Sequence, residues 1–342
     1  MMHNKDIIIG GEKIKPGETK DVSLFVAKLY DFTDVFMPVK IIRGREDGPR
    51  LFVCATIHGD EVNGIEIIKR LLRNKRLKKI KGTLIAVPIV NVFGFNNMSR
   101  YLPDRRDLNR CFPGSKKGSL ASRLANLFVT EILNTCTHGI DLHTGSLHRT
   151  NLPQVRVCLK DEATNCLAHA FDVPVILNAD LIDGSLRKIA YRKKIPLIVF
   201  EGGEPLRYDE VAIRCGVGGV LAVMRALGMI PIESKKSNPI KSFIANGSYW
   251  ERASHSGILI IKKRLGSVIK PDDLLGIVSD PLGNNSIEIR AKSEGIIIGH
   301  TQIPLVNGGD ALFHVATFSR IKHVSKSIEQ FDDKFDYEER YA

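Results

Sequence analysis

Residues 51–61 read Leu-Phe-Val-Cys-Ala-Thr-Ile-His-Gly-Asp-Glu, an apolar run that ends in a His-x-x-Glu pair. A short apolar run with β-branched residues predicts a buried strand, and residues 61–74 carry isoleucine and leucine at helical spacing. A strand therefore ends near His58 and a helix opens near Glu61. Because ligands bind beyond the carboxyl ends of strands in open α/β sheets, this junction is a candidate functional site.

The same alternation continues to about residue 227. We expect strands at 51–57, 83–90, 139–142, 155–159, 173–177 and 196–200, and helices at 61–74, 120–133, 186–193 and 208–227. Strands that alternate with helices predict an α/β fold, with a mixed or parallel sheet flanked by helices.

The pattern changes after residue 230, and this change sets the expected domain boundaries. We predict an α/β domain at 1–230, including N-terminal strands in 1–50, and a polar linker at 231–239. Short apolar runs between turn residues predict a smaller all-β domain at 240–325. The charged tail, 326–342, either frays or packs late. The glycine pattern of the β domain is similar to biotinyl/lipoyl barrel-sandwich domains, but the hairpin tip at 281–285 lacks an acceptor lysine. We therefore expect a structural domain at the rim of the site.

Composition narrows the class of protein. The chain has no apolar segment near the roughly 20 residues that cross a bilayer, and residues 1–6 lack the apolar core of a signal peptide. Six cysteines without a Cys-x-x-Cys pair predict reduced thiols in a cytoplasmic protein. The net charge of +12 suits an anionic small substrate, since no nucleic-acid motif accompanies it. We expect no nucleic-acid or membrane partner. The sequence leaves open whether the protein forms a homo-oligomer.

A second histidine falls at another strand end. Residues 140–143 read Ile-Asp-Leu-His, so His143 joins His58 and Glu61 at the same edge of the sheet. Two imidazoles and one carboxylate can hold zinc with a fourth position free for water, which is typical of catalytic zinc sites. A His-x-x-Glu pair alone is more often structural. Asp141 either orients an imidazole or faces the opposite side of its strand.

Four motifs occur in order and carry a family resemblance. They are HGDEVNG at 58–64, DLNRCFPG at 107–114, DLHTG at 141–145 and FEGG at 200–203. Together they resemble the succinylglutamate desuccinylase/aspartoacylase family, which is related to zinc carboxypeptidases. The resemblance spans about residues 50 to 230.

The resemblance implies a metal centre and a catalytic base. One zinc ion per chain would be held by His58, Glu61 and His143. Glu201, which closes an apolar strand and precedes two glycines, would act as general base and acid. Glu204 is the competing candidate for the base. The alternative for Glu201 is a structural role, in which it either caps the turn or binds an arginine.

The resemblance also implies substrate-binding residues. Asn109 and Arg110 would bind a substrate carboxylate, because a guanidinium fork matches a carboxylate and the amide adds a neutral donor. The alternative for Arg110 is a surface ion pair with Asp107. Arg187 resembles a second substrate arginine of aspartoacylases.

Arg100 resembles the family arginine that polarises the scissile carbonyl and stabilises the oxyanion. The spacing to the DLNRCFPG motif is loose, so Arg105 and Arg106 remain alternatives for this role.

These inferences predict a zinc-dependent hydrolase that acts on a linear amide C–N bond. It would remove the acyl group from a small anionic N-acyl amino acid by means of a metal-activated water. The alternative is a metallocarboxypeptidase that uses the same residues on peptide C-termini. A binding protein with an idle base is a third class, but the complete set of ligands and base argues against it.

Overall fold

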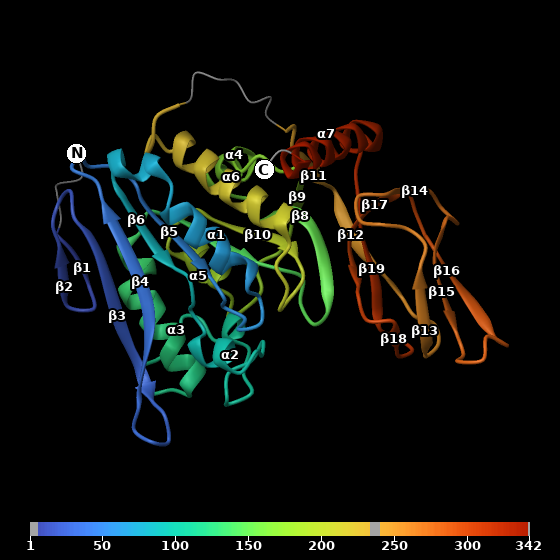
Figure 1. Cartoon of the computed structure of the whole chain (residues 1–342), viewed down its shortest axis with the longest axis horizontal. Helices are drawn as coiled ribbons and strands as arrows, with labels where there is room; N and C mark the ends of the chain where they lie inside the picture. The colour runs from blue at the N-terminus through green and yellow to red at the C-terminus, as the bar shows by residue number, and fades with distance from the viewer. Residues whose placement is uncertain (1–5, 233–239, 341–342) are drawn as a thin grey trace.

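The computed structural model describes residues 6–232 and 240–340, and it confirms a mixed sheet flanked by helices with an antiparallel β region beside it (Figure 1). Residues 233–239, most of the predicted linker, lie outside the described residues. The main sheet has thirteen strands. In chain order they are β3 (Thr19–Lys28), β4 (Asp34–Arg43), β5 (Arg50–Ala55), β6 (Thr83–Val87), β7 (His138–His143), β8 (Arg149–Val157), β9 (Val175–Asn178), β10 (Leu197–Gly203), β11 (Phe243–Ala245), β12 (Gly247–Arg252), β14 (Val268–Ile269), β17 (Gly295–Thr301) and β19 (Ala311–Thr317).

The centre of the sheet is parallel. β5 lies between β6 and β7, and β10 continues the parallel order beyond β7. β4 and then β3 extend the sheet antiparallel on one side, and β8 pairs antiparallel with β10 on the other. The carboxyl ends of β5, β7 and β10 therefore meet at one edge, where the predicted site residues lie.

Helices cover both faces of this sheet. They are α1 (Asn63–Leu72), α2 (Val92–Asn96), α3 (Leu120–Glu131), α4 (Glu162–Ala170), α5 (Leu186–Arg192), α6 (Glu210–Ala226) and α7 (Ile321–Arg340), with 3₁₀ turns η1 (Lys75–Lys79), η2 (Leu108–Arg110) and η3 (Leu133–Thr135). Alternate residues of β5 face opposite ways. Leu51 and Val53 pack in the core that contains α1 and α6, whereas Phe52 packs in the other core, with its ring 5.7 Å from that of Phe128 in α3.

The C-terminal β region joins the main sheet directly. β17 pairs antiparallel with the start of β8, and β19 and β12 follow it in order. A separate four-stranded sheet contains β13 (Gly257–Ile261), β15 (Leu274–Ser279), β16 (Ser286–Arg290) and β18 (Leu305–Val306). Its core includes Leu259, Leu275 and Phe313. The predicted hairpin tip at 281–285 connects β15 to β16.

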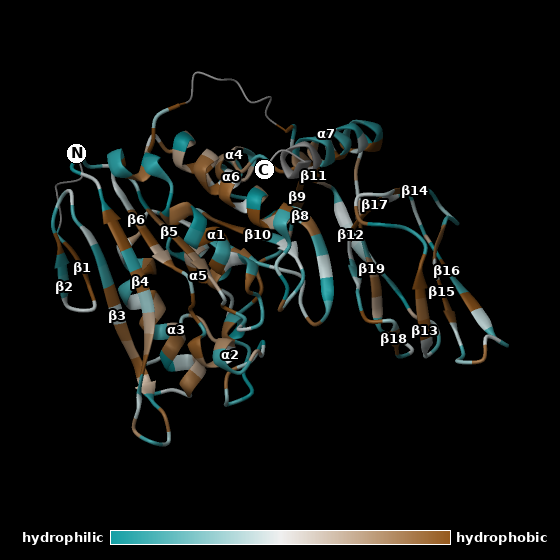
Figure 2. Cartoon of the chain, viewed as in Figure 1, coloured by the Kyte–Doolittle hydropathy of each residue, from teal (hydrophilic) through white to brown (hydrophobic). Residues whose placement is uncertain are grey.

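Among the described residues, three α-helices were not expected from the sequence: α2, α4 and α7. α4 begins after Asp161, whose carboxylate accepts from the Thr164 backbone N–H at 2.8 Å, and this N-cap was the available signal. The charged tail forms α7, which buries Val324, Ile328 and Phe331 beneath a hydrophilic outer surface (Figure 2). The charged composition of this segment did not indicate a helix, and tertiary packing stabilises it.

Two further features complete the fold. Residues 7–14 form a small hairpin of β1 (Ile7–Ile9) and β2 (Glu12–Ile14), from which Ile7, Ile9 and Ile14 enter the core on the α3 side. All six cysteines are free thiols. None of the helices in the described part of the chain combines the length and apolar character needed to cross a membrane.

Candidate metal centre and active site

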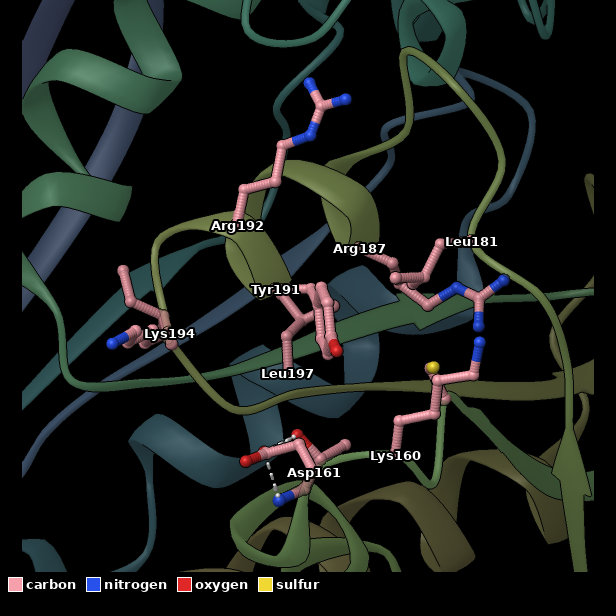
Figure 3. A pocket seen from close by; sticks show the side chains of 11 residues that line it. Lys160, Asp161, Leu181, Arg187, Tyr191, Arg192, Lys194 and Leu197 are labelled. Atoms are coloured by element: carbon pink, nitrogen blue, oxygen red, sulfur yellow. Dashed lines mark hydrogen bonds between the residues drawn. The ribbon is translucent and has the colours of Figure 1, made fainter.

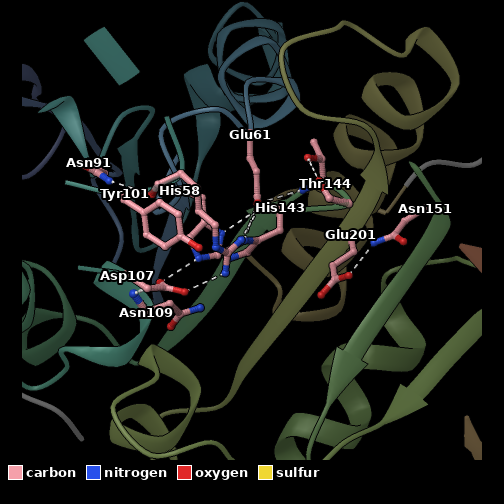
Figure 4. Close-up of polar contacts among 12 residues, drawn as sticks. His58, Glu61, Asn91, Tyr101, Asp107, Asn109, His143, Thr144, Asn151 and Glu201 are labelled. Atoms are coloured by element: carbon pink, nitrogen blue, oxygen red, sulfur yellow. Dashed lines mark hydrogen bonds and ion pairs between the residues drawn. The ribbon is translucent and has the colours of Figure 1, made fainter. Parts of the chain in front are cut away.

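The structure brings His58, Glu61 and His143 together at the carboxyl ends of β5 and β7 (Figure 4). All three side chains are buried, and their candidate ligand atoms lie within 4.8 Å of one another. His58 Nδ1 is 2.7 Å from Glu61 Oε1, and His143 Nδ1 is 2.7 Å from Glu61 Oε2. The Nδ1 atoms of both imidazoles therefore converge on one carboxylate.

Local backbone features position these ligand side chains. Thr56, between β5 and His58, has φ of 58° and is buried, which is a strained conformation for a β-branched residue. Gly59 is needed for close approach rather than for a positive φ, because a Cβ there would lie 1.9 Å from the carbonyl carbon of Gly94. Asn63 donates to the Gly202 carbonyl at 3.2 Å and so ties the start of α1 to β10.

A carboxylate contacts the Nε2 atom of each imidazole. Asp141 Oδ2 is 2.8 Å from His143 Nε2, so Asp141 faces the imidazole of its own strand. Asp107 Oδ1 is 3.1 Å from His58 Nε2, a contact that sequence reasoning missed although Asp107 opens the DLNRCFPG motif. When Nε2 of an imidazole donates to a carboxylate, Nδ1 is left as the lone-pair donor that a metal requires.

The electrostatics of the cluster favour a cation. Burial alone would lower the pKa of His58 and His143, but the adjoining carboxylates outweigh it and raise both pKa values. Burial would raise the pKa of the Glu61 carboxyl, yet the two imidazoles hold that pKa well below its usual range. A metal ion takes the place of the protons in such a cluster. Two imidazole nitrogens and one carboxylate fit zinc, with a position left for water.

An open pocket of about 540 Å³ surrounds these ligands and contains every predicted site residue. Its lining includes His58, Glu61, Arg100, Asn109, Arg110, His143, Arg187 and Glu201. Arg100 lies beside the candidate metal ligands, with Nη1 3.3 Å from Glu61 Oε1 and Nη2 2.8 Å from Asp107 Oδ2. The alternatives Arg105 and Arg106 are exposed and lie outside the lining.

Glu201 lies beside the cluster on the neighbouring strand. It pairs in register with His143 across β10 and β7, which places both residues at the same edge. Its carboxylate accepts from Asn151 Nδ2 at 2.8 Å and lies 3.1 Å from Arg156 Nε. No sequence signal marked these two β8 residues. Glu204, the alternative base, pairs with Arg207 at 3.4 Å and is not part of the pocket lining.

Asn109 and Arg110 occupy η2 on the pocket wall. Asn109 Oδ1 accepts from the Leu186 backbone N–H at 2.9 Å, which leaves the amide nitrogen of Asn109 as its donor group. Arg110 is exposed, and its Nη1 donates to the Asn109 carbonyl at 2.8 Å. The alternative ion pair with Asp107 is not formed, because the Asp107 carboxylate is engaged by His58 and Arg100.

Arg187 takes a different position from the other predicted substrate residues. Its guanidinium donates to the backbone carbonyls of Ala179 at 3.1 Å and Asp180 at 2.8 Å. It lines both the active-site pocket and a second pocket of about 470 Å³, where Figure 3 shows it near Lys160 and Tyr191. Its direct contact with substrate stays a prediction.

The comparisons with known proteins agree with this fold. Residues 47–227, just over half of the chain, match the Succinylglutamate desuccinylase/Aspartoacylase catalytic domain. The chain belongs to this family. It is 25% identical over 296 residues to the N-alpha-acetyl-L-2,4-diaminobutyric acid deacetylase of Halomonas elongata, which covers 82% of this chain and 86% of that protein.

Solved structures share this fold over most of the chain. A succinylglutamate desuccinylase/aspartoacylase from Rhodobacter sphaeroides superposes with a TM-score of 0.79 at 21% identity, covering 88% of this chain and 96% of that one. The product-bound ectoine utilization protein EutE (DoeB) from Ruegeria pomeroyi gives a TM-score of 0.78 at 23% identity, covering 87% and 95%. At these identities the likeness establishes the fold.

Proposed function

We propose that this protein is a zinc-dependent hydrolase that removes the acyl group from an N-acyl amino acid. The observation that carries the proposal is the convergence of His58 Nδ1, Glu61 and His143 Nδ1 beside Glu201 in one pocket. Family membership supports the reaction class, and the deacetylase from Halomonas elongata supports the kind of substrate.

The metal would be held by His58, Glu61 and His143, and when bound it would polarise the amide carbonyl and make water acidic near neutral pH. Asp107 and Asp141 hold the imidazoles in the orientation that ligation needs. Arg100 adds a positive charge beside this centre, where the developing oxyanion would lie.

Glu201 takes the proton of the attacking water and returns it to the leaving amine. Asn151 and Arg156 position its carboxylate toward the pocket. The α-carboxylate of the substrate is bound by the Asn109 amide and the Arg110 guanidinium on the facing wall. Arg187 shapes that wall through the carbonyls of Ala179 and Asp180.

The test is turnover by the zinc-loaded protein on a panel of N-acetyl and N-succinyl amino acids and short peptides. We expect hydrolysis of N-acyl amino acids, whereas cleavage of peptide C-termini alone would support the metallocarboxypeptidase. Glu201→Gln should keep zinc and fold but lose on the order of 10² or more in turnover. Glu204→Gln, outside the pocket lining, is the matched control. A near wild-type rate for Glu201→Gln would move the base elsewhere.

A further inference from the structure

The second pocket, of about 470 Å³, adjoins the active-site pocket but contains none of the candidate metal ligands. Four cationic side chains line it: Lys160, Arg187, Arg192 and Lys194. Asp161 is the single acidic residue among the described residues of this lining. The volume lies within the range of roughly 300–1,000 Å³ that is typical of small-molecule sites. The excess of positive charge indicates an anionic ligand.

The carboxylates near the second pocket do not neutralise these cations. Asp161 Oδ2 caps α4, where it accepts from the Thr164 backbone N–H at 2.8 Å and from the Thr164 hydroxyl at 2.5 Å. Asp183 forms its ion pair with Lys188, which lowers the pKa of Asp183, and Arg192 adds a smaller effect of the same sign. Within residues 6–232 and 240–340, three of the four cationic side chains make no hydrogen bond or ion pair: Lys160, Arg192 and Lys194. Their charges are therefore available to a ligand.

An aromatic ring lies among the cations of the second pocket. In the view of Figure 3 the exposed Tyr191 ring is at the middle of the group, with Lys160 and Arg187 on one side and Arg192 and Lys194 on the other. The Lys160 side chain is directed toward the Arg187 guanidinium. Two like charges that face one another repel, and an anion between them reverses the sign of the interaction. This arrangement suits a ligand whose apolar body contacts Tyr191 and whose charged groups reach cations on both sides.

The segment between β9 and α5 contributes to both pockets. Ala179, Asp180 and Ile182 line the active-site pocket, whereas Leu181 lines the second pocket. Arg187 lines both pockets and holds this segment, because its Nη1 donates to the Ala179 carbonyl at 3.1 Å and its Nη2 donates to the Asp180 carbonyl at 2.8 Å. Each of these nitrogens carries a second N–H, so the guanidinium can also donate to a ligand in the second pocket.

We propose that the second pocket is an effector site, which binds a small organic anion with two or more negative charges and acts on the active site through Arg187. The bound anion accepts from Arg187 and fixes its guanidinium against residues 179–182, which line the active-site pocket. We expect this to tighten substrate binding with little change in kcat. By linkage, the substrate then tightens binding of the effector by the same factor. The coupling rests on the proposed function, whereas binding of the anion does not.

Isothermal titration calorimetry of the zinc-loaded protein tests the binding site. Two pairs of probes keep the apolar body and remove the charge: adenosine monophosphate with adenosine, and isophthalate with isophthalamide. Inorganic phosphate supplies the charge without the body. We expect saturable binding of at least one charged organic probe, with affinity about tenfold or more above that of its neutral partner. The pair that shows this preference distinguishes a phosphate from a carboxylate ligand.

Variants assign the binding to the second pocket. Lys160→Gln should weaken binding of the charged probe by about 10- to 150-fold, the range for one charge-assisted hydrogen bond, and Lys160→Arg should recover part of it. Lys193→Gln is the matched control, because Lys193 is exposed beside Lys194 but lies outside the pocket lining, and it should keep the affinity. Arg110→Gln removes a cation of the active-site pocket and should also keep it. Circular dichroism and zinc content verify that each variant is folded.

Kinetics test the connection between the two pockets. A saturating concentration of the bound probe should lower KM for an N-acyl amino acid by about fivefold or more, and Lys160→Gln should require more probe for the same effect. Failure of every charged probe to bind, unchanged affinity in Lys160→Gln, or loss of binding in Arg110→Gln would overturn the effector site. A KM that stays constant or rises with the probe would overturn the coupling. Probe binding that depends on Lys160, without hydrolysis of any N-acyl amino acid, would retain the anion site and reject the proposed function together with the coupling.

Discussion

Removing the Asp141 carboxylate, which contacts Nε2 of His143, tests whether the orientation of this imidazole sets the metal affinity. Asp141 is fully buried, accepts from His143 Nε2 at 2.8 Å, and also accepts from Cys54 Sγ at 3.4 Å. Asp141→Ala leaves the buried imidazole N–H without a partner. Asp141→Asn keeps an oxygen that can accept from the imidazole but loses the charge.

The structure sets the magnitude of the effect. A hydrogen bond to a charged group contributes about 1.5–3 kcal/mol, which corresponds to about 10- to 150-fold in affinity. Removal of such partners of metal ligands typically costs on the order of 10- to 100-fold in metal affinity. We therefore expect Asp141→Ala near the upper part of this range and Asp141→Asn near the lower part.

The assay is a competition titration of zinc against a chromophoric chelator, with circular dichroism to verify folding. Asp180→Asn is the matched control, because Asp180 is an exposed carboxylate on the rim of the same pocket. It should leave zinc affinity nearly unchanged. A folded Asp141→Ala protein with wild-type zinc affinity would refute the argument that this hydrogen bond prepares the ligand.

Four further outcomes are expected. Purified protein should hold about one zinc per chain, and His58→Ala should lose most of it by elemental analysis; a stoichiometric variant would exclude this ligand. Arg110→Ala should lower kcat/KM about 10- to 150-fold for a free-acid substrate but little for its methyl ester, whereas equal losses would remove Arg110 from the site. Gly184→Ala should raise KM, because residue 184 has φ of 74° and a Cβ would lie 2.2 Å from the Arg110 carbonyl oxygen; an unchanged KM would contradict this coupling. The pKa of His314 falls from an ordinary 6.5 to about 3 in the folded protein, so its contribution to stability is present above pH 6.5 and is lost as the pH falls toward 3. Urea unfolding should therefore show that His314→Gln loses about 2 kcal/mol less stability than the wild type between pH 7 and pH 5, and equal losses would argue against a buried neutral imidazole.

The local pattern of the sequence was sufficient to predict the α/β core. Alternating strand and helix periodicity predicted β5, α1 and β7 and placed His58 and His143 at strand ends, because parallel strands in such folds expose their carboxyl ends at one edge. The ordered motifs identified the family, which the match over residues 47–227 confirms. These conclusions depend on short-range periodicity and on residues within a few positions of one another.

The contacts between distant segments were decided only by the tertiary structure. Asp107 reaches His58 across 49 residues, and it pairs with Arg100 rather than with Arg110. The many charged residues of α7 hid the helix in the sequence. Tertiary packing stabilises this helix, with Phe331 buried in the core.

The part of the active-site pocket that is lined by Trp250 and His314 shows the physical reason most clearly. Neither residue belongs to a motif, and their stacking depends on the register between β12 and β19. Their approach to Arg149 depends in turn on the pairing of β17 with β8. The sequence by itself determined which segments form strands and where ligands follow them. Strand pairing and register, which arise from contacts across the whole chain, decided which side chains share the pocket.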